Sequence, residues 1–145
     1  MSRTTHKYIK LKNMTPAKYK AKDLKGRWVF GTPIETKPSL KFGFHKWWII
    51  ESAFSHGGYF YIGQRKSIKE ETLCVKTSLK DINSKEIYTN DILTDNAGRK
   101  YIVVKDNNPK ECITVETEAN KTMPLDMSDI LSREFRIVGN KFDND

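Results

Sequence analysis

One stretch decides the fold, and it reads Thr77-Ser78-Leu79-Lys80-Asp81-Ile82-Asn83-Ser84-Lys85-Glu86-Ile87-Tyr88-Thr89-Asn90-Asp91-Ile92-Leu93. Turn-forming residues occupy positions 81–84 and again positions 89–91. Such clusters of Asp, Asn and Ser between short apolar runs predict tight turns. The stretch therefore predicts a strand, a turn, a short strand, a second turn and a third strand. Its apolar positions Leu79, Ile87 and Ile92 are expected to point into one core.

A first hairpin is predicted before this stretch. Basic and apolar residues alternate over residues 18–22, and a turn at 23–26 leads into a second strand that Gly31 ends. Alternation of this kind is typical of a half-buried strand. In the second strand, Trp28 and Phe30 are expected on one face and Val29 on the other.

A second hairpin is predicted in the middle of the chain. The prolines of residues 31–43 favour a loop or an edge connection over a helix. After this loop, aromatic and β-branched runs at 47–50 and 59–62 lie on either side of Gly57-Gly58. This pattern is a strong hairpin signal.

Short strands and turns continue to the C-terminus. Strands are predicted at 72–76, 100–104 and 111–116, a short helix at 124–131 and a final strand at 134–139. Asp126 or Ser128 is expected to cap the helix. The spacing predicts a mainly β fold, a small antiparallel barrel or curled sheet that is SH3-like in size, with a hairpin extension and one short C-terminal helix.

The stretch at 77–93 resembles the signature of the YopX family, small proteins encoded mostly by bacteriophages and prophages. Two more segments resemble that family, Gly26-Arg27-Trp28-Val29-Phe30-Gly31 and Ile137-Val138-Gly139-Asn140-Lys141-Phe142-Asp143-Asn144. The resemblance runs in order from about Lys18 to the C-terminus. It implies a phage or prophage origin and work inside a bacterial cell.

The family signature is interpreted first as a folding element. The family places glycine where this chain has Ser84 and Asn90, which implies a positive φ at both positions. Asn tolerates that conformation better than Ser, so Ser84 is expected to be strained or to sit in a changed turn. Asp81 and Asp91 are expected to close their turns. Ligand binding by Asp81, Glu86 or Asp91 is the alternative.

Positive charge is concentrated near the N-terminus. The 145 residues carry a net charge of +8, and residues 1–25 hold eight Lys or Arg against one acid. We interpret residues 1–17 as a basic N-terminal arm and 18–145 as a single domain. The asymmetry predicts contact with nucleic acid, a nucleotide or an acidic protein surface, and a merely solvated arm is the alternative.

Membrane, metal and cofactor classes find no support in the sequence. No apolar run approaches the roughly 18–20 residues that span a bilayer, and no secretory signal is present, so a cytoplasmic protein is expected. Cys74 and Cys112 lie in apolar, β-branched surroundings that predict free thiols. No phosphate-binding loop or metal-ligand spacing is present, and no cofactor is expected.

Catalysis is the weaker class of function. A nucleophile needs a base within hydrogen-bond reach, and His6, His45 and His56 have no Ser, Cys or Asp at a spacing that catalytic motifs use. Turn chemistry explains Ser55-His56 without catalysis. An enzyme would require His45, His56 and an acid to converge in one pocket.

The middle hairpin carries five aromatic residues: Trp47, Trp48, Tyr59, Phe60 and Tyr61. Adjacent strand residues point to opposite faces, so one face should expose aromatic surface. That surface predicts a subunit or partner interface, stacking of nucleobases, or a second layer of the domain. The expected binding residues are Lys18, Lys20, Lys22, Arg27, Trp47, Trp48, Tyr59, Tyr61 and Arg65.

These patterns favour a phage-encoded, non-enzymatic binding protein that acts on a host component. Inhibition of a host defence system is the expected purpose, by blocking a host protein or sequestering a nucleotide signal. A homo-oligomer without membrane association is expected. The alternatives are a nucleic-acid-binding module that uses the basic segment and exposed aromatics, and an enzyme with an unrecognised site.

Overall fold

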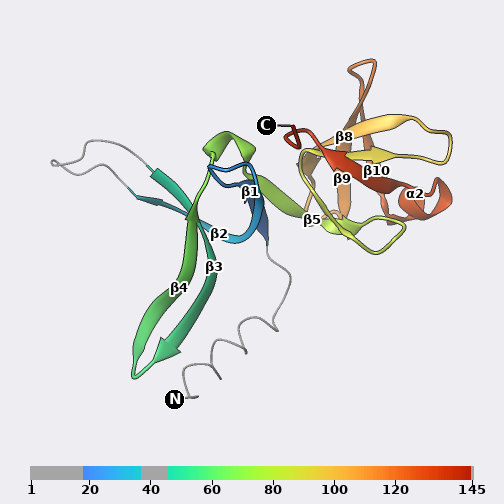
Figure 1. The fold of residues 1–145 in the computed structure, drawn as a ribbon. Coiled ribbons are helices and arrows are strands. Elements are labelled where there is room, and N and C mark those ends of the chain that lie inside the picture. Colours follow the sequence, from blue (N-terminus) through green and yellow to red (C-terminus); the bar gives the residue numbers. More distant parts are fainter. Residues whose placement is uncertain (1–17, 37–45, 145) are drawn as a thin grey trace. The chain divides into compact units, whose positions relative to one another are not determined.

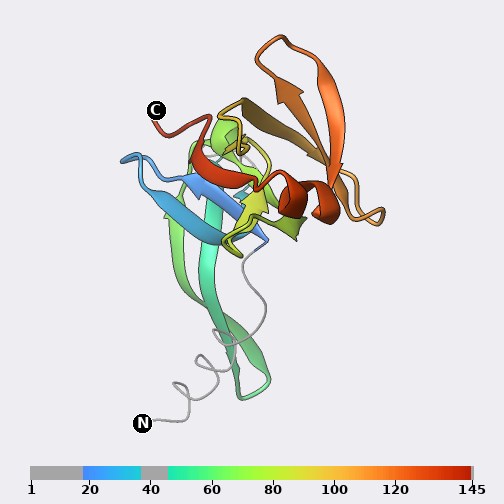
Figure 2. The ribbon, with the colours of Figure 1, turned by 90° about the vertical axis from the view of Figure 1, so that its right-hand side faces the viewer.

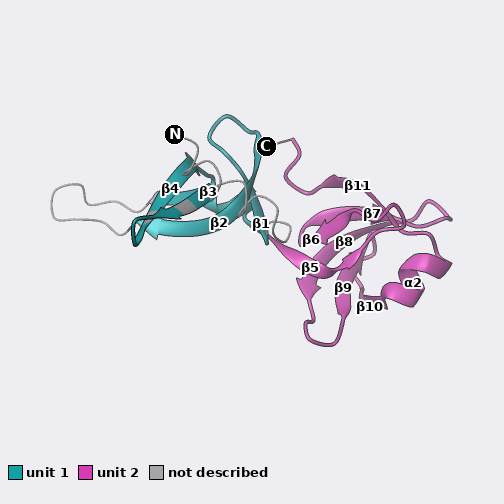
Figure 3. Ribbon diagram, turned by 90° about the horizontal axis from the view of Figure 1, so that it is seen from below, with its two compact units in different colours: residues 1–73 teal, residues 74–145 magenta. Residues whose placement is uncertain are grey.

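The computed structural model describes residues 18–36 and 46–144. The chain divides into two compact units, Met1–Leu73 (unit 1) and Cys74–Asp145 (unit 2), which Figure 3 distinguishes by colour. The predicted arm at 1–17 lies outside the described residues. The single domain expected over 18–145 stays a prediction, and each unit is described by itself.

Within unit 1, four antiparallel strands are paired in the order β4-β3-β2-β1 (Figure 1). Its elements are β1 (Tyr19–Lys22), β2 (Trp28–Thr36), β3 (Lys46–His56), β4 (Tyr59–Ser67) and the 3-10 turn η1 (Glu70–Thr72). Both predicted hairpins are confirmed. The hairpin of β3 and β4 is long and extends beyond the ends of β1 and β2 (Figure 2).

Residues 31–43 were predicted to form a loop or an edge connection, and the loop is wrong for residues 31–36, because β2 continues to Thr36. Pro33 is paired with Ile49 of β3, and the register of β1 on β2 ends at Gly31. Proline is tolerated there because its missing N–H takes no ladder bond from β1. Residues 37–43 of the predicted loop lie outside the described residues.

The core of unit 1 is small. The buried side chains are Ala21, Val29, Ile49 and Ile68, with Trp47 and Leu73 packed against them. Ala21 lies opposite Val29 in the register, so both point to the same face of the sheet. Trp28 and Phe30 therefore point to the other face, as the alternation predicts.

Unit 2 combines a two-stranded hairpin with a five-stranded antiparallel sheet in the order β10-β9-β8-β7-β11. Its elements are β5 (Cys74–Lys80), β6 (Glu86–Tyr88), β7 (Asp91–Thr94), β8 (Lys100–Asp106), β9 (Cys112–Thr117), β10 (Thr122–Asp126), α2 (Met127–Ser132) and β11 (Arg136–Asn140). The mainly β class with one short C-terminal helix is confirmed. Across the described ranges the sheets stay open, which selects the curled sheet over the closed barrel.

The predicted helix begins three residues too early. Residues 122–126 form β10, an edge strand that pairs with β9 and accommodates Pro124. Asp126 is the cap, as expected: its Oδ1 accepts the N–H of Asp129 at 2.9 Å, and Asp129 Oδ2 accepts the N–H of Asp126 at 2.9 Å. This reciprocal pair is a capping box and fixes the helix start at Met127.

The stretch at 77–93 forms the predicted series of strands and turns as β5, β6 and β7. Leu79 and Ile87 are buried in the unit 2 core, but Leu93 takes the place predicted for Ile92. Alternation explains the error, because Asp91 and Leu93 share the inward face of β7 and Ile92 points away.

One turn geometry recurs at four places in the described chain. The turns begin at Asp23, Asp81, Asp95 and Thr117, and the side chain of each accepts the N–H four residues later. The fourth residue of each turn has a positive φ: Gly26, Ser84, Gly98 and Asn120. This pattern is the three-residue hairpin loop that ends in a left-handed residue. The predicted positive φ is thus confirmed at Ser84 (65°) and also at Asn90 (71°).

The second signature turn is tied to the C-terminal strand. Asp91 accepts the N–H of Tyr88 at 2.8 Å through one carboxylate oxygen. The other oxygen accepts the side-chain amide of Asn140 at 2.9 Å. Both side chains are buried, so the pair satisfies polar groups that would otherwise destabilise the core.

Candidate functional site

One face of the unit 1 sheet gathers basic and aromatic side chains. It is the face opposite Val29 and Ile49, and the register places Lys20 opposite Phe30 on it. We call the following set the basic–aromatic face: Lys20, Trp28, Phe30, Ile34, Trp48 and Arg65. The strand pairings β1–β2, β2–β3 and β3–β4 bring these residues together from all four strands.

Cations lie over the tryptophan rings of this face. Arg65 has its guanidinium carbon 4.8 Å from the centre of the Trp48 ring. Lys20 has its ammonium nitrogen 4.7 Å from the centre of the Trp28 ring. At these distances the ring quadrupole attracts the cation. The face therefore presents π surfaces and positive charge side by side.

The nine residues predicted to bind do not all reach this face. Lys20, Trp48 and Arg65 belong to it. Lys22 has the same strand parity and lies 5.1 Å from the Trp28 ring centre, but it is only 4% exposed. Trp47 points to the opposite side and packs against the core, as expected for the neighbour of Trp48.

The remaining predicted residues lie elsewhere in unit 1. Lys18 is exposed just before β1. Arg27 is exposed as well, but its guanidinium is paired with Asp23 at 3.1 Å. Tyr59 (70% exposed) and Tyr61 (43% exposed) lie near the free end of the β3–β4 hairpin, with ring centres 6.5 Å apart.

The sequence prediction missed Trp28, Phe30 and Ile34 as surface residues. Phe30 is 46% exposed, and Trp28 and Ile34 are half-buried. The sequence pattern contained part of this information, because Trp28 and Phe30 share the strand face opposite Val29. The pairing of Ile34 with Trp48 was not predicted, because the prolines of residues 31–43 favoured a loop or an edge connection there.

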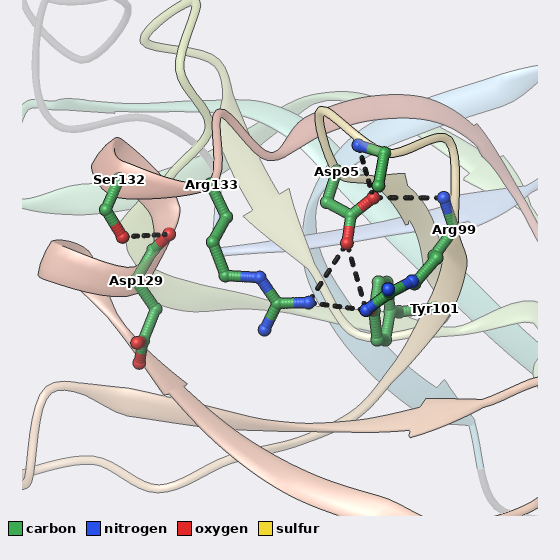
Figure 4. A network of polar contacts seen from close by, with 7 residues as sticks. Asp95, Arg99, Tyr101, Asp129, Ser132 and Arg133 are labelled. Carbon is green, nitrogen blue, oxygen red and sulfur yellow. Dashed lines mark hydrogen bonds and ion pairs between the residues drawn. The ribbon is translucent and has the colours of Figure 1, made fainter.

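A second polar arrangement lies in unit 2 around Arg133 (Figure 4). Its Nη2 donates to Asp95 Oδ2 at 3.0 Å and to the Tyr101 hydroxyl at 2.6 Å. The Tyr101 hydroxyl in turn donates to Asp95 Oδ2 at 3.1 Å. The guanidinium also lies 5.0 Å from the centre of the Phe135 ring. Arg133 is therefore held in place from several directions.

Both charged groups of this network have shifted pKa values. Burial by itself raises the pKa of Asp95, but hydrogen bonds from Arg99, Arg133 and Tyr101 outweigh it and hold that pKa below its ordinary value. Burial by itself lowers the pKa of Arg133, and the bond to Asp95 outweighs it and raises that pKa. Both groups stay ionised at neutral pH.

Metal-ligating side chains do not gather in the described part of the chain, where no group of three or more His, Cys, Asp or Glu is placed to hold an ion. Cys74 and Cys112 form no disulfide there, as predicted. His56 is exposed at the end of β3, and His6 and His45 lie outside the described residues. Among the helices of the described ranges, none has the length and apolar character to cross a bilayer.

Over residues 18–36 and 46–144, open antiparallel sheets, one short capped helix and a basic–aromatic surface define a small, mainly β protein. The family model described as "YopX protein" matches residues 18–145, so the chain belongs to the YopX family. This match confirms the resemblance that residues 77–93 carry. No curated protein matches the chain closely enough to count as a relative.

Proposed function

We propose that this YopX protein acts by binding, without catalysis, and that its basic–aromatic face binds single-stranded nucleic acid. The observation that supports the proposal is the placement of Arg65 over Trp48 and Lys20 over Trp28 on one face of a sheet. Single-stranded nucleic acid is bound by aromatic rings that stack on bases and by cations that contact phosphates. One face of unit 1 offers both.

A comparison of contact energies favours replacement of the Arg65 cation by a nucleobase on the Trp48 ring. A cation–π contact at an exposed site contributes about 0.5–1 kcal/mol. Stacking of a base on an aromatic side chain contributes about 1–3 kcal/mol. A base therefore gains more from the Trp48 ring than Arg65 does, and the displaced guanidinium can contact a backbone phosphate. The basic residues before Gly26 add long-range attraction for the same ligand.

A second candidate is a protein partner at the end of the β3–β4 hairpin. Tyr59, Tyr61 and Ile62 are all exposed there. Tyrosine is a favoured anchor of protein interfaces because it buries a large area at a small cost in side-chain entropy. With a phage origin, such a partner would be a host protein whose blocking inhibits a defence system, or a second copy of this chain.

The nucleic-acid proposal is tested by titrating a labelled oligothymidylate into the full chain and following fluorescence anisotropy. Trp48→Leu removes the π surface and is expected to weaken binding by about 5–150-fold, the equivalent of 1–3 kcal/mol. Trp48→Phe keeps a ring and is expected to retain most of the affinity. Equal affinity of Trp48→Leu and the wild type would overturn the proposal.

Further variants test the role of the Arg65 charge and the location of the binding surface. Arg65→Gln is expected to lower the slope of log affinity against log salt by about 0.7, as the loss of one phosphate contact from a single strand does. Lys85→Gln removes one exposed charge from unit 2 and is the matched control, with no change expected. Tyr59→Ala should leave oligothymidylate binding intact. If a discrete host protein is recovered with the tagged wild type and is lost with Tyr59→Ala alone, the second candidate is favoured.

A further inference from the structure

Unit 2 contains an open pocket of about 660 Å³ whose lining joins two of the recurrent turns. The turn that begins at Asp95 contributes Ala97 and Arg99, and the turn that begins at Thr117 contributes Glu118 and Ala119. Its volume lies within the range of about 300–1,000 Å³ that small-molecule sites occupy. The pocket is large enough for one small organic ligand.

Arg133 is the fixed cation of this pocket. Only its Nη2 donates to protein acceptors among the described residues, and its Nε and Nη1 donors are left for a ligand. The side chain is 30% exposed although its neighbours hold it firmly. A positioned guanidinium is a strong partner for phosphate oxygens, because little side-chain entropy is lost on binding.

The rest of the lining divides by chemistry. Arg99 and Lys100 are exposed cations next to the pocket, and Asp95 is a buried anion already neutralised by Arg133. Glu118 supplies an exposed carboxylate that can accept hydrogen bonds from hydroxyl groups. Ala97, Ala119 and Met123 add apolar surface. Two exposed cations, the remaining donors of the paired Arg133, one accepting carboxylate and apolar groups fit a ligand with a phosphate and a hydroxylated body.

We propose that this pocket binds a sugar phosphate, free or as part of a nucleotide. The phosphate contacts Nε and Nη1 of Arg133 together with Arg99 and Lys100, and Glu118 accepts hydrogen bonds from sugar hydroxyls. The proposal goes beyond nucleic-acid binding by unit 1 and does not depend on it.

The test is a titration of the full chain with ribose 5-phosphate, followed by NMR of the arginine Nε–H and tryptophan Nε1–H signals. Ribose 5-phosphate has no base to stack on a tryptophan, so the basic–aromatic face should not respond. We expect the Arg133 Nε–H signal to shift and the Trp48 Nε1–H signal to stay. Ribose alone and inorganic phosphate are both expected to bind at least about fivefold more weakly, which is roughly 1 kcal/mol.

The variants chosen leave the Asp95 network in place, because Arg99 takes part in it only through its backbone and Lys100 takes no part in it. The double variant Arg99→Gln with Lys100→Gln is expected to weaken ribose 5-phosphate binding at least about tenfold, because it loses two charge-assisted contacts to the phosphate. Lys105→Gln removes an exposed charge further along β8 and should change nothing. Tighter binding of adenosine monophosphate than of ribose 5-phosphate, with the same Arg133 shift, identifies a nucleotide as the source, and equal affinity identifies the sugar phosphate alone.

An unmoved Arg133 signal at about 10 mM ribose 5-phosphate, a concentration well above a dissociation constant of about 1 mM, would overturn the proposal. Binding by ribose or inorganic phosphate alone as tight as that of ribose 5-phosphate would also overturn it. Neither outcome bears on oligothymidylate binding by Trp48, so failure of one proposal is distinguishable from failure of the other.

Discussion

Unit 1 and unit 2 are built from the same antiparallel hairpins and the same recurrent turn, but they bury very different amounts of apolar side chain. Four buried residues form the core of unit 1, whereas ten form the core of unit 2 among the described residues. In unit 2 the aromatic rings of Tyr101 and Phe135 pack edge to face with centres 5.1 Å apart. In unit 1, Phe30 and Tyr59 remain exposed.

This difference separates stability from surface chemistry. Aromatic side chains that fill a core contribute burial energy, and those left on a sheet face are available to a ligand or partner. The family signature lies in unit 2, where it builds the core and the turns. The signature therefore contributes to folding, and the basic–aromatic face of unit 1 is the surface on which the nucleic-acid proposal rests.

The largest expected effect contrasts Phe135 with Phe30. Phe135→Ala removes a ring that is 0% exposed and should lower the free energy of unfolding of unit 2 by about 4 kcal/mol. Phe30→Ala removes a ring that is 46% exposed and should cost about 1 kcal/mol or less. Urea denaturation with amide hydrogen exchange read separately in each unit measures both. Equal losses of unfolding free energy in the two variants would contradict the expected difference between the two units.

A smaller effect contrasts the same turn aspartate in the two units. Asp95→Asn keeps an oxygen for the turn N–H groups but loses the charge that pairs with Arg133, and should cost about 3 kcal/mol at pH 7. Asp23→Asn loses a pairing with Arg27, whose side chain is 61% exposed, and should cost about 1 kcal/mol or less. Denaturation of both variants and of Glu118→Gln as a surface control tests the difference.

The pH dependence of that difference has a defined sign. The folded-state pKa of Asp95 is lowered, so its contribution is complete above the unfolded pKa of about 3.9 and is lost as the pH falls through the folded pKa. Wild type and Asp95→Asn should therefore converge in stability below about pH 3.9. A stability gap that stayed constant down to pH 2 would contradict the ionic role of Asp95.

The smallest expected effect concerns the left-handed turn position. Ser84→Gly in unit 2 relieves a positive φ and should raise the stability by about 0.5–1 kcal/mol, because the left-handed penalty exceeds the added chain entropy of glycine. Gly26→Ser in unit 1, where φ is 82°, should lower it by a similar amount. Thermal unfolding of the pair measures whether the turn is equivalent in both units. A destabilising Ser84→Gly would show that it is not.

Parts of the candidate site followed from the sequence. Alternation in β3 predicted that Trp47 and Trp48 face opposite ways, and the half-buried Trp48 lies beside the exposed Arg65 on the basic–aromatic face. The sequence did not predict that Lys22 is buried or that Ile34 belongs to the basic–aromatic face. Both depend on which strands are neighbours and on how far β2 extends. The pocket around Arg133 was not predicted at all, since its lining comes from two turns, β8, β10 and the end of α2.

What the sequence by itself determined is local. An Asp or Thr at the start of a turn and a Gly, Ser or Asn three positions later fix the four hairpin turns, because a side-chain acceptor and a tolerated positive φ act within five residues. Only the tertiary structure decided that Leu93, not Ile92, enters the core, and that Arg133 meets Asp95 at a separation of 38 residues. Such contacts depend on strand register and burial, and these are set by the pairing of distant segments.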